Sequence, residues 1–334
     1  MKTPWEFLQY SRNKIKNTWK IAFVSAFVIG LLIHLPVMLS DIPNHDGLSS
    51  MYFDQNMITS GRWFLTVACG FSSYFTIPWV IGLIGMVWLS LASVVLTETM
   101  ELEDPLTIIG VSGLLVSFPA LASTFAYVFT MDGYMMALFL AVLSVLFTKK
   151  YKKGWILGGV CLAFSMGIYQ AYLPFAILLC VYVILLFFME EHGVKEKAQY
   201  TLRYLGMGIT GAVLYYVILQ ILLKLQGKVL DTYQGINSME QGGSGQGLLT
   251  TLKGMYYDFL AFTLHGDVLV NNIFSFAACA VLLLSVLFLL VRRMFQRKWW
   301  KNPVFFVIII LLAVGLPLLT NVILIISPNL TYHL

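Results

Sequence analysis

Residues 20–40 have the sequence KIAFVSAFVIGLLIHLPVMLS, a run of mostly apolar side chains with one histidine and one proline near its end. A helix of about 20 such residues is long enough to cross the roughly 30 Å hydrocarbon core of a bilayer. Similar runs recur along the 334-residue chain, which is 59% hydrophobic and 11% charged, with a mean hydropathy of +0.82. The sequence therefore predicts an all-α polytopic membrane protein.

The apolar runs predict about nine transmembrane helices. They lie at residues 20–40, 76–97, 106–127, 132–148, 154–170, 172–189, 204–224, 270–291 and 303–327. If the N-terminus is cytoplasmic, all but four of the 21 lysines and arginines fall in cytoplasmic segments, the exceptions being Arg62, Lys224, Lys228 and Lys253. This asymmetry follows the positive-inside rule. The net charge of +5 is therefore a topology signal, and no nucleic-acid partner is expected.

Several common kinds of site are absent from the sequence. The cysteines at 69, 161, 180 and 279 have no CxxC spacing, so neither a disulfide framework nor a zinc site is indicated. The chain has no GxSxG, HExxH or P-loop motif. One acidic stretch, TETMELEDP (97–105), falls on the predicted cytoplasmic side, although acidic residues contribute little to orientation.

The first outer loop, residues 41–75, contains most of the unexpected charge. Its segment NHDGLSSMYFDQNMITSGRWF (44–64) predicts an interfacial helix over 46–59, with Asp46, Ser50 and Asp54 recurring every four residues along one side. Asp46 fits a helix N-cap as well as a general base, and Asp54 is its rival for the base. His45 fits a polar interfacial residue better than a metal ligand, and we expect it near the substrate.

Three further features could contribute chemistry on the outer face. Arg62 either snorkels to lipid headgroups or binds one defined phosphate. Asp132 in TMDGYMM lies at a membrane boundary on a tight turn predicted at 132–134, where it is either a second catalytic acid or a capping residue. Tyr169 and Gln170 in GIYQAYLP lie on another turn, predicted at 169–172, as sugar ligands or as interfacial aromatic and polar residues.

The second outer segment, residues 226–269, includes QGINSMEQGGSGQG (234–247). Its glycine content is typical of a loop or lid over a site. We found no repeat of 20–50 residues, so residues 1–334 are predicted to form one transmembrane domain.

The order of these motifs resembles the Gtr-type, serotype-converting membrane glucosyltransferases of the GT-C superfamily. The closest correspondences are HDG…GRWF near the N-terminus and GIYQAYLP in mid-chain. The resemblance implies a GT-C-like helical bundle that takes a sugar from a polyprenyl-phosphate carrier. On it, Asp46 matches the catalytic acid, Arg62 the Gly-Arg-Trp signature and Asp132 the second acidic turn. Because members commonly continue through further helices, we expect part of the family's C-terminal fold to be absent.

The predicted function is inverting transfer of a sugar, glucose by the resemblance, to a surface polysaccharide or lipid on the outer face of the bacterial cytoplasmic membrane. The expected partners are the lipid-linked donor, a surface glycan acceptor and membrane lipid. A phosphodiester donor carries less charge than a nucleotide diphosphate, so neither a metal nor another cofactor is expected. A transporter or lipid flippase and a non-catalytic assembly subunit remain the alternative classes.

Overall fold

The computed structural model describes residues 3, 14–40, 57–69, 77–190, 192–232, 237, 248–261, 273–296, 298–301 and 303–326. Within these residues all regular elements are helices, which confirms the predicted all-α class. The chain divides into two compact units, Met1–Leu230 and Asp231–Leu334, and each is described by itself.

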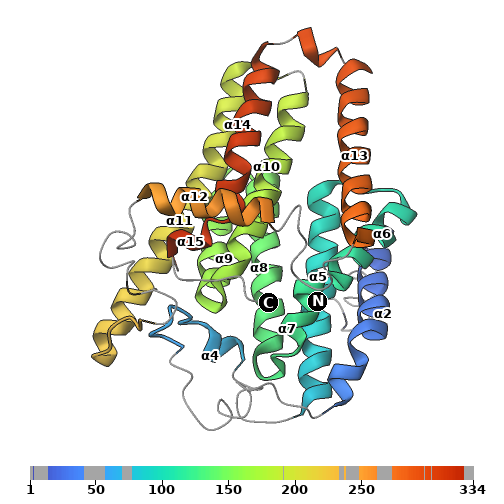
Figure 1. Cartoon of the computed structure of the whole chain (residues 1–334). Coiled ribbons are helices and arrows are strands. Elements are labelled where there is room, and N and C mark those ends of the chain that lie inside the picture. The colour runs from blue at the N-terminus through green and yellow to red at the C-terminus, as the bar shows by residue number, and fades with distance from the viewer. Residues whose placement is uncertain are drawn as a thin grey trace. The chain divides into compact units, whose positions relative to one another are not determined.

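The first unit is a bundle of long helices (Figure 1). Its elements are α2 (Asn17–Leu39), α4 (Leu65–Ala68), α5 (Pro78–Met100), α6 (Pro105–Ser117), α7 (Pro119–Phe125), η2 (Val128–Thr130), α8 (Met131–Lys150), α9 (Gly154–Ile168), η3 (Gln170–Tyr172), α10 (Leu173–Met189) and α11 (Val194–Gln226). The main contacts form a row in the order α6, α2, α5, α8, α9, α11, and α10 packs on α8 and α11. Neighbours in this row are thus not always neighbours in the sequence.

Six helices of the described residues are long and apolar enough to cross a membrane. They are Asn17–Leu39, Pro78–Met100, Val128–Lys150, Gln170–Met189, Val194–Gln226 and Phe276–Gln296. Two shorter apolar helices, α6 and α9, lie in predicted spans. The chain is therefore a multi-span membrane protein, while the count of nine spans stays a prediction.

The third predicted span, 106–127, is not one continuous helix. It is divided into α6 and α7 at Phe118, the residue before Pro119. Proline disfavours helical backbone in the preceding residue and has no N–H to continue the ladder, which explains the break.

A histidine from another helix compensates for this break. His34 of α2 is 2% exposed, and its Nε2 donates to the Val116 carbonyl oxygen at 2.8 Å. The imidazole also stacks on Phe125 of α7, with ring centroids 3.8 Å apart. Inside a bilayer no water is present to donate to a carbonyl oxygen that the break leaves unpaired. The His34 imidazole is the donor that pairs with it instead.

Small residues let the helices of the first unit approach closely. A Cβ on Gly82 of α5 would lie 2.6 Å from the Met38 side chain of α2, and one on Gly159 of α9 would lie 2.7 Å from Thr210 of α11. Van der Waals packing at small residues is a principal source of helix association in membranes.

The acidic stretch 97–105 lies against basic residues at one end of the first unit. Glu98 accepts hydrogen bonds from Lys16 at 2.8 Å and from the Trp19 indole at 2.7 Å, and it lies 3.6 Å from the Lys150 ammonium. The start of α2 and the ends of α5 and α8 therefore meet at one end, called here the basic end. That this end is cytoplasmic stays a prediction.

The second unit contains α12 (Leu248–Leu260), α13 (Ile273–Gln296), η6 (Trp299–Lys301), α14 (Pro303–Thr320) and α15 (Ile323–Ile326). The Tyr256 hydroxyl of α12 donates to the Val314 carbonyl at 2.5 Å, and the Asn321 side-chain amide donates to the Met255 carbonyl at 2.8 Å. These contacts hold α12 against the C-terminal half of α14 and the residue that follows it. Within the predicted loop 226–269, residues 248–260 are thus helical, and the role of a lid stays a prediction.

Candidate active site

The Gly61-Arg62-Trp63 segment lies on a tight turn that begins at Met57. Gly61 has a φ of 77°, in the left-handed region that glycine enters without a steric penalty. The Gly61 N–H donates to the Ile58 carbonyl at 3.0 Å, and the Arg62 N–H donates to the Met57 carbonyl at 2.6 Å. These hydrogen bonds therefore fix the peptide groups before and after Gly61.

Trp63 anchors this turn to the end of α9. Its side chain is 8% exposed, and its ring packs directly over Gly167, where an added Cβ would lie 2.6 Å from the ring. The next residue, Phe64, donates its N–H to the Gly167 carbonyl at 2.7 Å and meets Phe164 edge-on at 4.6 Å between centroids. The absence of a side chain at Gly167 thus makes room for the indole.

A second attachment comes from η3 and α11. The Gln170 amide nitrogen donates to the Ser60 carbonyl at 3.2 Å and to the Tyr215 hydroxyl at 3.0 Å. Tyr215 in turn donates to the Gly61 carbonyl at 3.1 Å. Gln170 and Tyr215 are 5% and 2% exposed, so this attachment is buried.

Arg62 extends from the turn into a group of tyrosines. Its Nη1 donates to the Tyr134 hydroxyl at 3.4 Å, and the guanidinium carbon lies 5.0 Å from the centroid of the Tyr169 ring. Tyr134 and Tyr169 stack on each other with centroids 4.4 Å apart. Aromatic faces attract a guanidinium, so this pair holds the cation in one place. Arg62 is half-buried, and its planar fork suits a phosphate.

Asp132 lies in the first turn of α8 and is 3% exposed. The prediction of a tight turn at 132–134 was wrong, because α8 already begins at Met131, directly after η2. An acid in the first turn complements the helix dipole, and its Oδ1 accepts from the Gly133 N–H at 2.9 Å. Asp132 is thus two residues from the tyrosine that meets Arg62; its catalytic role stays a proposal.

Glycine 133 joins this helix end to the segment that follows Arg62. A Cβ there would collide with the Cys69 sulfur and lie 3.2 Å from Leu65. The structure thus brings together Arg62, the start of α8 and the turn at η3. The predicted turn at 169–172 is confirmed as η3.

Three predicted site residues, His45, Asp46 and Asp54, lie outside the described residues. The interfacial helix predicted over 46–59 therefore stays a prediction, except that residues 57–60 form a turn instead of a helical end.

Sequence reasoning missed two members of the site, Tyr134 and Tyr215. Tyr134 follows the Asp132-Gly133 pair directly, so its position in that motif was an available signal. Tyr215 lies in the apolar run AVLYYVIL, where a tyrosine gives no sign of which face it occupies. Only the fold shows that Tyr215 and not Tyr216 faces inward: Tyr215 is 2% exposed and Tyr216 is 42% exposed.

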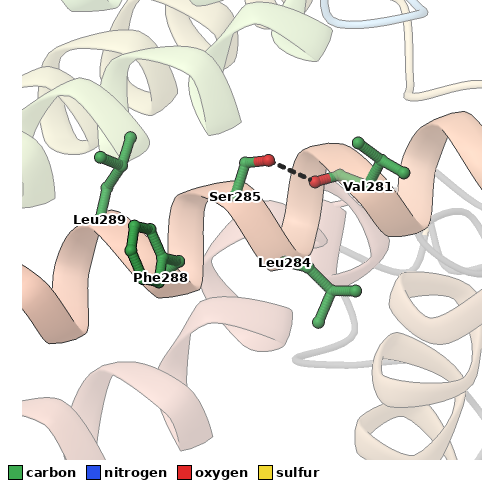
Figure 2. Close-up of a pocket in the computed structure, with 5 residues that line it drawn as sticks. All are labelled: Val281, Leu284, Ser285, Phe288 and Leu289. Atoms are coloured by element: carbon green, nitrogen blue, oxygen red, sulfur yellow. Dashed lines mark hydrogen bonds between the residues drawn. The ribbon is translucent and has the colours of Figure 1, made fainter.

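Other parts of the described chain offer less chemistry. Among these residues no group of three or more His, Cys, Asp or Glu side chains could hold a metal ion. A hollow along α13 is lined by Val281, Leu284, Ser285, Phe288 and Leu289 (Figure 2). Its one hydroxyl, on Ser285, donates to the Val281 carbonyl at 2.7 Å, so the hollow presents an apolar wall.

A bundle of apolar helices, long enough to cross a membrane and with an arginine held among tyrosines, defines a multi-span membrane protein with a polar candidate site. The sequence model of the family described as Glucosyl transferase GtrII matches residues 35–333, most of the chain. The chain therefore belongs to this family, which confirms the resemblance seen in its motifs and makes it a membrane glucosyltransferase with a sugar donor and an acceptor. A search of curated proteins and a search of solved structures each returned no significant match.

Proposed function

We propose that the protein transfers glucose from a polyprenyl-phosphate carrier to a surface polysaccharide or lipid on the outer face of the bacterial cytoplasmic membrane. The observation that supports this most is the position of Arg62, which lies over Tyr169 and donates to Tyr134. These residues come from three segments far apart in the sequence. The family to which the chain belongs indicates that the reaction is a glucosyl transfer.

A lipid-linked phosphate suits this site better than a soluble sugar nucleotide. Arg62 lies on a turn that packs against the C-terminal end of α9 and against Tyr215 of α11, and its guanidinium reaches Tyr134 in the first turn of α8. The first turn of α8 is at the end of that helix opposite the basic end. We expect a phosphate whose lipid tail lies in the bilayer to meet the Arg62 guanidinium at this end of the helices. Guanidinium grips two phosphate oxygens at once, which would orient the anomeric carbon of the attached sugar.

The proposed reaction is a direct displacement. The acceptor hydroxyl oxygen forms a bond to the anomeric carbon, the bond from that carbon to the phosphate oxygen breaks, and the hydroxyl proton passes to a carboxylate. The polyprenyl phosphate leaves with the bonding electrons, and Arg62 stabilises its developing charge. Attack opposite the leaving group inverts the anomeric centre.

We assign the base to Asp46, with Asp54 as its rival. Both precede Arg62 on the same loop, and a positioned carboxylate is worth about 10²–10⁴-fold as a general base. Asp132 is the proposed second acid, on the grounds that it lies two residues before Tyr134. His45 and Tyr169 are proposed sugar or acceptor contacts. The Gln170 amide nitrogen already has two protein partners, so we assign Gln170 to holding the loop.

A transporter is the main alternative, and the buried charges argue against it. Among the described residues, the acidic, basic and histidine side chains that are fully buried are His34 and Asp132. His34 lies near the C-terminal end of α2 and Asp132 at the N-terminal end of α8. Ion-coupled transport usually needs ionisable groups near the bilayer midplane.

The test replaces each candidate base in turn in a strain that lacks the native gene. Asp46→Asn should abolish addition of glucose to the surface glycan, with protein levels in the membrane unchanged. Asp54→Asn is the matched control, since it removes the other acid of the same loop. If Asp46→Asn retains transfer and Asp54→Asn loses it, the base is Asp54. If both variants retain transfer, the proposed mechanism is wrong.

A further inference from the structure

We propose that Tyr215 of α11 is a positioning residue that holds the peptide bond before Arg62 and, through it, the cation that binds the donor phosphate. The inference rests on the proposed function of Arg62 and names a residue that the proposed mechanism does not use. Tyr215 lies more than 150 positions from Arg62 in the sequence, and its hydroxyl donates to the Gly61 carbonyl at 3.1 Å.

The peptide group between Gly61 and Arg62 is held from both sides. Its oxygen accepts from Tyr215, and its N–H donates to the Met57 carbonyl at 2.6 Å. A peptide group is planar, so fixing its oxygen and its N–H fixes the direction in which the Arg62 Cα lies. Because Gly61 has a φ of 77° and no Cβ to limit its backbone, this direction depends on the two hydrogen bonds.

The Tyr215 hydroxyl has a second partner that completes the arrangement. It accepts from the Gln170 amide nitrogen at 3.0 Å, and the same nitrogen donates to the Ser60 carbonyl at 3.2 Å. Two successive carbonyls of the turn, Ser60 and Gly61, are thus paired with side chains from η3 and α11. Both side chains are almost fully buried, where no water replaces a lost partner.

A simple packing role for Tyr215 makes a different prediction. Phenylalanine keeps the ring and removes only the hydroxyl, so Tyr215→Phe preserves the packing of α11 but leaves the Gly61 carbonyl unpaired. The neighbouring Tyr216 is 42% exposed and supplies a matched control for loss of a tyrosine hydroxyl in the same turn of the same helix. If packing is all that matters, the two variants should behave alike.

The experiment measures transfer by the purified full-length protein in nanodiscs, with polyprenyl-phosphate glucose as donor and a surface glycan from a deletion strain as acceptor. We expect Tyr215→Phe to lower kcat/KM for the donor by about 10–100-fold, in line with the cost of a small misplacement of a catalytic group. Tyr216→Phe should stay within about twofold of the parent. Gln170→Met, which removes the second donor to the turn, should lower kcat/KM in the same direction.

Coupling to Arg62 separates this inference from the proposed function. If Tyr215 acts through Arg62, Tyr215→Phe should cost little in an Arg62→Lys background, because the losses of linked residues do not add. Losses that multiply fully would overturn the inference. If Arg62→Lys lowers transfer while Tyr215→Phe and Gln170→Met both match Tyr216→Phe, the inference is wrong and the proposed function stands. If Arg62→Lys leaves transfer unchanged, the proposed function itself is wrong.

Discussion

Replacing Gly167 by alanine should disable the site from a position that has no polar side chain. The added Cβ would lie 2.6 and 2.7 Å from two carbons of the Trp63 ring, well inside the ordinary carbon–carbon contact distance of about 3.5–4 Å. The indole would therefore have to move by roughly 1 Å. Overpacking of this kind costs about 1–3 kcal/mol, and the higher helix propensity of alanine offsets up to about 1 kcal/mol of it.

Activity should respond more strongly than stability. Trp63 adjoins Arg62, and a displacement of about 1 Å at a reacting group costs on the order of 100-fold in rate. The assay compares transfer from polyprenyl-phosphate glucose with thermal unfolding in detergent. Gly208→Ala is the control, because an added Cβ there meets no atom within 4 Å. Equal activity of the two variants would refute the idea that contact between Gly167 and Trp63 positions Arg62.

Three further substitutions test the fold by thermal unfolding in detergent. Glu98→Gln should lower stability by about 1 kcal/mol, because it weakens the contacts with Lys16 and Trp19, whereas the exposed Glu103→Gln should have no effect. His34→Phe should cost about 1–3 kcal/mol by leaving the carbonyl at the α6–α7 break unpaired, and His34→Gln should recover part of that loss. Asp104→Ala should destabilise α6, and Asp104→Asn should destabilise it less, since asparagine also caps helices but carries no charge. Hydrogen bonds from its own helix hold the pKa of the Asp104 carboxyl below its ordinary value, so the difference between Asp104 and Asp104→Ala should be complete at neutral pH and fade as the pH falls through that lowered pKa.

The all-α membrane class was predictable because long apolar runs are a strong signal. The orientation that the basic residues predict stays a prediction. Even the acidic stretch 97–105, which ran against the charge pattern, pairs with Lys16 and Lys150 at the basic end. The break at Phe118 was not predicted, because an apolar run does not show whether its helix is continuous. Pro119 was a local signal for it, but the partner that makes the break tolerable, His34, comes from α2.

Short motifs predicted some residues of the candidate site, but they did not predict the residues that hold its turn in place. Arg62 and Tyr169 were singled out from short motifs, and the fold brings them within contact. The sequence predicted that Gln170 binds the substrate, but in the structure its amide nitrogen donates to the Ser60 carbonyl of the protein's own turn. Tyr215 was missed because burial in a membrane helix depends on which neighbours pack against it, and apolar residues occupy both faces of such a helix.

The most direct test of the proposed function is the choice of donor by the purified protein. Reconstituted protein is given a surface glycan from a deletion strain and either radiolabelled polyprenyl-phosphate glucose or radiolabelled UDP-glucose, each with and without a metal chelator. We expect label to enter the glycan from the lipid-linked donor alone, with an inverted anomeric centre and without any effect of the chelator. Transfer from UDP-glucose, or no transfer from the lipid-linked sugar, would contradict the proposal.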